Sequence, residues 1–398
     1  MRQLLLCACA TALLSGTAQA EELSLRGSII PEIRYFPDSA SNARQDSTDL
    51  SVAGEMTGKY FFGDNDNQSI VVTPFARWDQ RDHRRTHYDL REARYGIVMG
   101  DWELRAGIDK VFWGVTEAVH LVDIVNQVDV IEDPIKQEVR LGQPMVRLRT
   151  TQDFGTFDLF VLPYFRERTY PSADGRPATD IPVDTHMTSY ESNRDERHVD
   201  AAARYSHTLG DVDFGVAYFQ GTGRDPILQP ALSSSGDLVL APFYAQIKQA
   251  SFDAQATKGA WLYKAEGYWR DELNEQYEAV TGGIEYTFYS LFNGSDLGVV
   301  AEYALDSRGL VARAPYQNDG FVALRWTAND EASTTLLGGT VIDAKTGAMG
   351  FRLKGERRMS EDYLVSLEAY GFADVPPRDP VYNIADDGYV QLRVARFF

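Results

Sequence analysis

Apolar and polar residues alternate along most of the chain, in segments of about ten residues. In residues 25–35, Ile29 and Ile33 fall on one face of an extended chain, and Glu32 and Arg34 fall on the other. A period of two residues is typical of β-strands, and long strands with one apolar and one polar face are typical of transmembrane barrels. The pattern therefore predicts strands that face lipid on one side and a polar lumen on the other.

The connections between these segments are of two alternating kinds. Tight turns at residues 100–101 and 210–211 alternate with long polar loops such as 37–48 and 168–196. The count gives eighteen strands, with sixteen as the alternative because the tenth, residues 238–252, is unusually long. We predict an all-β fold, a transmembrane up-and-down antiparallel β-barrel with both termini on the periplasmic side. Aromatic residues near strand ends predict an interfacial girdle: Trp261, Trp269, Tyr277, Tyr286, Trp326, Tyr363 and Tyr389.

Both ends of the chain carry signals of export. Residues 1–20 combine a basic start, an apolar run over 4–14 and small residues at 18–20, which is the layout of a cleaved secretory signal peptide. The last strand ends on Phe398 and resembles the C-terminal signature of bacterial outer-membrane barrels, which the barrel-assembly machinery is thought to read. We expect a mature barrel over residues 21–398 in the cell outer membrane.

Composition excludes several classes of function. The formal net charge of −19 argues against a nucleic-acid partner, and 44% apolar with 12% aromatic residues argues against disorder. Both cysteines, Cys7 and Cys9, fall in the predicted signal peptide. The chain has no histidine or cysteine spacing typical of a metal site, so we expect no metal and no cofactor.

Arginine and lysine outnumber the acids on the predicted inward faces, although the whole chain is acidic. The candidates for the pore wall are Arg94, Arg105, Arg147, Arg149, Arg325, Arg352 and Glu103. Guanidinium groups stay charged and match carboxylate geometry, so such a wall favours anions. The same arginines would instead only fill the lumen if they pair with inward acids on neighbouring strands. Both interpretations remain open.

The segment from about 113 to 143 follows neither the strand period nor a clean helical one. A connection this long in a compact domain is usually functional, and its apolar residues need a surface to pack against. We predict that it folds into the barrel as the third outer loop and narrows the pore. Its candidate residues are Trp113, His120, Asp123, Asn126, Asp129, Glu132 and Asp133. If the loop acids face wall arginines, they create a transverse field; if the loop lies over the mouth as a lid, they are solvated.

The sequence VFWG at 111–114, Asn126, Asp129, Phe398 and the arginine-lined strands resemble Gram-negative outer-membrane porins and export channels. They are similar in style to the alginate-export barrel and related eighteen-strand families. The resemblance implies passive passage of small anionic solutes or acidic saccharides. We expect a monomer, in contact with outer-membrane lipid and lipopolysaccharide, and no enzymatic activity.

Other functions remain open. An exopolysaccharide export channel has the same architecture. A barrel-embedded hydrolase needs a serine, a histidine and an acid at one rim, and His120 is the histidine inside the predicted constriction. A plugged adhesive or structural barrel would carry no current. The acid best placed to bridge calcium to lipopolysaccharide is Asp82.

Overall fold

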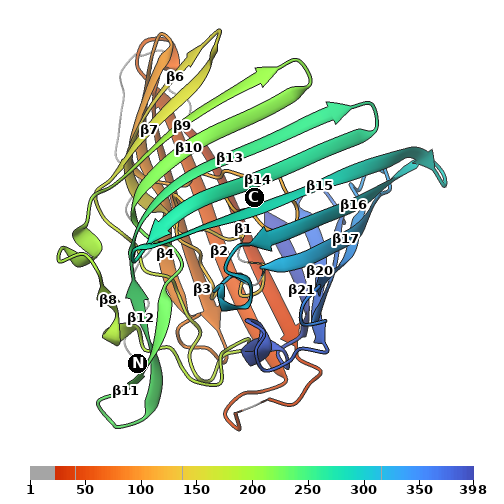
Figure 1. The fold of residues 1–398 in the computed structure, drawn as a ribbon. Helices are drawn as coiled ribbons and strands as arrows, with labels where there is room; N and C mark the ends of the chain where they lie inside the picture. The colour runs from red at the N-terminus through yellow and green to blue at the C-terminus, as the bar shows by residue number, and fades with distance from the viewer. Residues whose placement is uncertain (1–22, 41, 137, 315) are drawn as a thin grey trace, which may run out of the picture.

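The computed structural model describes residues 23–40, 42–136, 138–314 and 316–398. Within these ranges, eighteen antiparallel strands form a single sheet (Figure 1). The first strand, β1 (Leu23–Tyr35), pairs with the last, β21 (Tyr389–Phe397), with Ile33 opposite Leu392. The sheet therefore closes on itself, which confirms the predicted all-β, up-and-down barrel of eighteen strands.

The other barrel strands follow in chain order: β2 (Thr48–Phe62), β3 (Gln68–Asp79), β4 (His87–Met99), β5 (Trp102–Asp109), β6 (Gln143–Gln152), β7 (Gly155–Leu162), β9 (Asp200–Leu209), β10 (Val212–Thr222), β13 (Gln246–Lys258), β14 (Trp261–Glu272), β15 (Glu275–Leu291), β16 (Ser295–Asp306), β17 (Asn318–Thr327), β18 (Thr335–Asp343), β19 (Met349–Arg358) and β20 (Tyr363–Ala373). Short 3-10 turns cover Asp64–Asp66, Thr185–Met187, Asp195–Arg197, Gly309–Val311 and Tyr382–Ile384. None of the helical turns in the described ranges is long and apolar enough to cross a membrane.

The alternating pattern sorts side chains between the two faces of the barrel. On β1, Leu25, Ile29 and Ile33 are 59%, 48% and 39% exposed on the outer surface, whereas Glu32 and Arg34 are buried on the inner side. Apolar residues exposed outward in this way need a lipid environment, and polar residues inward need a lumen. This is the architecture of outer-membrane β-barrels.

Tight turns lie at one end of the barrel and long loops at the other (Figure 1). The predicted tight turns 100–101 and 210–211 are present, and their Gly100 and Gly210 have positive φ. The loop end has an exception, because Leu273 and Asn274 join β14 to β15 with φ of 52° and 66°. The alternation of short turns and long loops is therefore not complete.

Phe398 closes the barrel against Gly27. The Gly27 N–H donates to the Phe398 carbonyl (2.8 Å), and the Phe398 N–H donates to the Gly27 carbonyl (3.0 Å). A Cβ atom at Gly27 would lie 2.5 Å from the Phe398 ring, so the ring covers the space that glycine leaves free.

The predicted tenth strand, residues 238–252, is wrong in its first half. A small separate sheet combines β12 (Leu238–Tyr244) with β11 (Ile227–Leu232) and the short β8 (Ser189–Tyr190), and these three strands lie beyond the loop end of the barrel (Figure 1). The barrel strand is β13, and it begins only at Gln246. The alternation continues through both strands, so it does not reveal that the chain changes sheets at Ala245.

The aromatic girdle is confirmed only in part. Trp261 and Trp269 are exposed on the outer surface, as predicted. Tyr277 and Tyr389 are buried inside the barrel, at 5% and 2% exposure, so their assignment to the girdle is wrong. The predicted signal peptide, residues 1–20, lies outside the described residues.

Candidate pore constriction

Residues 110–142, which connect β5 to β6, fold into the barrel; we call them the inner loop. Val122 and Val125 are fully buried and belong to one apolar cluster with Phe160 on β7 and Phe219 on β10. The lumen wall removes these side chains from water, which is the favourable term that holds an otherwise irregular segment in place.

The inner loop follows the wall over many strands. The Trp113 ring meets the edge of Phe160 at a centroid distance of 5.7 Å. Leu121 packs against a cluster that contains Tyr268 on β14, and Ala118 packs against a cluster on β16 and β17. Trp113, a predicted constriction residue, is therefore a buried anchor of the loop.

Two wall carboxylates bind the backbone of the inner loop. Glu266 on β14 accepts from the N–H groups of Val115 (2.6 Å) and Thr116 (3.0 Å). Glu302 on β16 accepts from the N–H of Glu117 (2.8 Å). Because a charged acceptor makes a stronger hydrogen bond than a neutral one, these contacts fix residues 115–117, which lie outside the strands.

Asn126 ties the two ends of the inner loop together. Its Oδ1 accepts from the Val111 N–H (2.9 Å), and its Nδ2 donates to the carbonyls of Asp109 (3.0 Å) and Leu141 (2.9 Å). The side chain is fully buried. This predicted constriction residue therefore shapes the loop from within.

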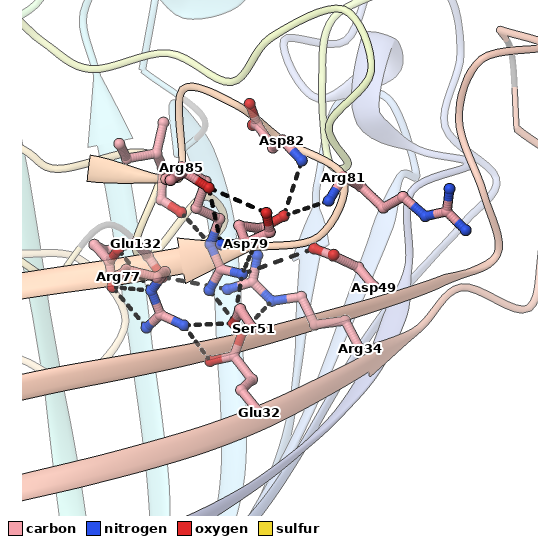
Figure 2. Close-up of polar contacts among 12 residues, drawn as sticks. Glu32, Arg34, Asp49, Ser51, Arg77, Asp79, Arg81, Asp82, Arg85 and Glu132 are labelled. Atoms are coloured by element: carbon pink, nitrogen blue, oxygen red, sulfur yellow. Dashed lines mark hydrogen bonds and ion pairs between the residues drawn. The ribbon is translucent and has the colours of Figure 1, made fainter. Parts of the chain in front are cut away.

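The tip of the inner loop is held by a buried ion-pair cluster (Figure 2). Arg77 on β3 contacts both carboxylate oxygens of Glu132, with Nε 2.9 Å from Oε1 and Nη2 2.8 Å from Oε2. Arg85 donates from Nε to the Ile131 carbonyl (3.0 Å). Burial alone would raise the pKa of Glu132, but Arg77 and Arg85 outweigh it and hold the pKa below its usual value.

The same cluster contains a second buried acid. Glu32 on β1 lies 2.6 Å from Arg85, 3.1 Å from Arg34 and 3.2 Å from Arg393. Ser51 accepts from Arg77 (2.6 Å). Buried charges are tolerated only when they are paired and hydrogen-bonded, and this network meets that condition by sharing each acid among several arginines.

A β-bulge directs a further arginine toward the inner loop. The register of β3 against β4 shifts between Thr73 and Pro74, because proline has no N–H to donate to the ladder. Arg91 on β4 lies at this irregularity, stacks on Phe75 at 4.2 Å and pairs with Asp129 of the loop, 3.2 Å away.

The other two candidate acids, Asp123 and Asp133, bind within the loop. Asp123 pairs with Arg140 at 2.8 Å, and Asp133 accepts from the N–H groups of Lys136 (3.3 Å) and Glu138 (2.7 Å). The acids proposed to create a transverse field thus have close partners inside the loop or on the wall.

His120 lies between two carboxylates. Its Nε2 is 3.9 Å from Glu138, and its Nδ1 is 3.9 Å from Glu266. Burial lowers the pKa of His120, but the two carboxylates outweigh burial and raise it to about 9. The histidine is therefore cationic at neutral pH. Its ring also meets Phe112, at 4.8 Å.

The candidate wall arginines differ in their pairing. Carboxylates pair with all but one of them: Arg94 with Asp109 (3.2 Å), Arg105 with Glu103 (2.6 Å), Arg147 and Arg149 with Asp158 (2.7 and 2.8 Å), and Arg325 with Glu117 (2.6 Å). Arg352 on β19 is the exception: within the described residues it has neither an ion pair nor a hydrogen bond, and its guanidinium lies 5.8 Å from the Tyr370 ring.

An open cavity lies between the inner loop and the wall formed by β17 to β20; its volume is about 1190 Å³ when the open solvent space at its mouth is included. Residues 117–118 and 134–136 of the loop line one side. Phe321, Val341, Arg352 and Tyr370 line the other. The side of the lumen that the inner loop leaves uncovered is thus the side that contains the unpaired arginine.

The sequence indicated the inner loop but missed several of its partners. The candidate residues did not include Arg77, Arg91, Lys136 or Glu266. A proline inside a strand, Pro74, was the available signal for the bulge that positions Arg91.

The described residues contain no group of three or more acidic, histidine or cysteine side chains that would hold a metal ion. Asp82, the predicted calcium candidate, is buried and accepts from the N–H groups of Arg84 (2.9 Å) and Ser172 (3.2 Å). These contacts join two outer loops.

The strand pairing and the inner loop together define the class: an outer-membrane β-barrel with its third outer loop folded into the lumen. No family model and no curated protein matches the chain. Among solved structures it is similar to OmpT, an outer membrane protein of Vibrio cholerae in its trimer form, with 10% identity over 96% of this chain and 100% of that chain and a TM-score of 0.48. It is also similar to a mutant of the Rh. blastica porin, with 12% identity over 95% of this chain and 100% of that chain and a TM-score of 0.46.

Proposed function

We propose that the protein is a porin-like channel of the outer membrane, through which small solutes, preferentially anions or acidic saccharides, diffuse. The observation that carries this proposal is the position of the inner loop. It is anchored to the wall from β7 to β17 and at β3, yet an open cavity remains between it and β17 to β20. A loop in this position narrows a lumen.

The proposed preference for anions rests on Arg352. The other candidate arginines are neutralised by nearby acids, whereas the charge of Arg352 faces the cavity without such a partner among the described residues. A guanidinium does not deprotonate in this setting, so its charge is available to a passing carboxylate at any physiological pH.

The setting of the channel follows from the outer surface. Outer-membrane lipid and lipopolysaccharide would surround the exposed apolar residues, and the assembly machinery would recognise the last strand with Phe398. We propose a monomer exported by the predicted signal peptide.

Single-channel recording in a planar bilayer tests the proposal. The purified barrel should give stepwise currents, and under a salt gradient the reversal potential should indicate anion preference. Arg352→Gln should move the reversal potential toward cations, whereas Arg357→Gln, at an exposed residue near a tight turn, should leave it unchanged. Cation preference of the wild-type channel would contradict the proposal.

A plugged barrel is the second candidate, because the contacts at Glu266, Glu302 and Arg77 hold the inner loop on several sides. A folded barrel that carries no current would favour this candidate.

A further inference from the structure

The lining of the cavity beside the inner loop is mostly apolar, and seven charged side chains contribute to it. Aromatic rings of Tyr316, Phe321, Tyr370 and Phe372 contribute to its lining. Aliphatic side chains complete it: Ile135, Val341, Met349, Val381 and Ile384. A lining of this kind, with a few placed polar groups, is typical of a binding site for a small organic molecule rather than of a water-filled passage alone.

Two glycines, Gly339 and Gly350, are part of the cavity wall. Across the ladder between β18 and β19, Gly339 pairs with Arg352, and Gly350 pairs with Val341. All four residues line the cavity. A Cβ atom at Gly350 would lie 3.9 Å from the nearest atom, on the Phe372 ring, so a larger side chain there has room to enter the cavity.

The carboxylates that line the cavity already have donors. Asp319 accepts from the N–H of Asn318 (2.9 Å), Asp343 from that of Lys345 (2.6 Å), Asp379 from that of Val381 (3.1 Å), and Glu117 pairs with Arg325 (2.6 Å). These acids are engaged in holding loops and wall together, so they offer little to a cationic ligand.

The three cations that line the cavity differ in whether they pair with an acid. Lys136 pairs with Glu138 at 2.6 Å, and Arg313 pairs with Glu272 at 2.6 Å. Arg352 has no such partner within the described residues, and its Nε is buried without an acceptor. A buried donor without an acceptor costs free energy, which a ligand carboxylate would recover.

We propose that this cavity is a binding site for a monocarboxylate with an apolar, ring-sized body, with Arg352 binding the carboxylate. The inference rests on the proposed channel function and narrows it to one class of solute. The guanidinium supplies parallel donors that match the two oxygens of a carboxylate. The aromatic and aliphatic lining removes the body of the same solute from water.

Isothermal titration of the full-length barrel in a non-ionic detergent tests the site, with benzoate as the probe. Benzoate should bind saturably. Benzyl alcohol lacks the charge and acetate lacks the ring, so each should bind at least about tenfold more weakly. Equal binding of benzyl alcohol and benzoate, or no binding of benzoate, would overturn the proposal.

Two variants test separately the charge of Arg352 and the open space of the cavity. Arg352→Gln should lower the affinity for benzoate at least about tenfold. Lys354→Gln removes the same charge at the next inward position of β19 and should leave this affinity unchanged. Gly350→Leu keeps Arg352 but fills the cavity, so it should also lower the affinity for benzoate. Wild-type affinity in both cavity variants would contradict the assignment.

Bilayer recordings distinguish a failure of this inference from a failure of the channel proposal. Benzoate should reduce the single-channel current of the wild type more than that of Arg352→Gln. Current that benzoate leaves unchanged would contradict the binding site and leave the channel standing. Absence of current would contradict the channel, and the titration would still test the site.

Discussion

Arg77 on β3 and Glu132 on the inner loop form a two-point ion pair in which both side chains are buried, with Nη2 2.8 Å from Oε2 and Nε 2.9 Å from Oε1. Another fixed point of the loop is Glu266 on β14, nearly half of the barrel circumference away in strand order. The loop is thus held at two distant parts of the wall, which explains how an irregular segment keeps one position in a wide lumen.

Glu132→Gln should release the tip of the inner loop. The amide cannot neutralise Arg77, and removal of one partner from a buried pair costs about 3–5 kcal/mol. We expect larger and noisier single-channel currents. Glu361→Gln, on an exposed turn, is the matched control. Recordings identical to the wild type would show that the pair does not hold the loop.

Asn126→Asp should loosen the base of the inner loop while keeping the shape of the side chain. A carboxylate still accepts from Val111 but faces the carbonyls of Asp109 and Leu141 without a donor, at about 1–3 kcal/mol for each group left unsatisfied. Hydrogen exchange in residues 110–136 should become faster. Asn193→Asp, at an exposed residue, should leave hydrogen exchange in residues 110–136 unchanged. Unchanged exchange in Asn126→Asp would contradict the role of the Asn126 side chain.

His120 should make the anchoring of the inner loop dependent on pH. Its pKa of about 9 in the folded protein lies above the ordinary 6.5, because the carboxylates of Glu138 and Glu266 outweigh burial and the opposing charge of Lys136. A raised pKa means that the stabilisation is fully present below about pH 6.5 and is lost as the pH rises through about 9. Channel noise should rise in that interval in the wild type. His120→Gln should show no such transition, and a variant that retains it would assign the effect to another group.

Gly27→Val should impair closure of the barrel. Its Cβ would lie 2.5 Å from the Phe398 ring, whereas a Cβ at Gly54 on the neighbouring strand has 3.9 Å to its nearest atom. Overpacking costs about 1–3 kcal/mol. Heat-modifiable migration on gels measures the folded fraction, which should fall for Gly27→Val and stay near wild type for Gly54→Val. Equal folded fractions would show that the Phe398 ring moves aside freely.

The strands could be predicted because each alternates and each is bounded by turn residues such as Gly100 and Gly210. Alternation says which face a residue occupies but not which strand lies beside it. That is why residues 238–244 were placed in the barrel rather than in the small sheet. Tyr277 and Tyr389 were assigned to the girdle because they lie near strand ends, and a position near a strand end does not decide which face a side chain occupies.

The candidate site could be located from the sequence but its contacts could not. The apolar residues of the inner loop need a surface to pack against, and the lumen wall of a barrel provides one. The partners of Glu132 and Asp129 depend on how the strands lie side by side and on the bulge at Pro74, which are properties of the closed sheet. From the sequence, paired and unpaired wall arginines were therefore equal alternatives. In the structure, five of the six candidate wall arginines pair with an acid, and Arg352 has no such partner among the described residues.

The most direct test of the account compares single-channel conductance of the wild type with that of a barrel in which residues 113–141 are replaced by a short Gly-Ser linker. We expect a measurable current in the wild type and a several-fold larger one after replacement, because the inner loop narrows an otherwise continuous lumen. Equal conductance in two barrels that fold to the same extent would contradict the constriction, and absence of current in both would contradict the channel itself.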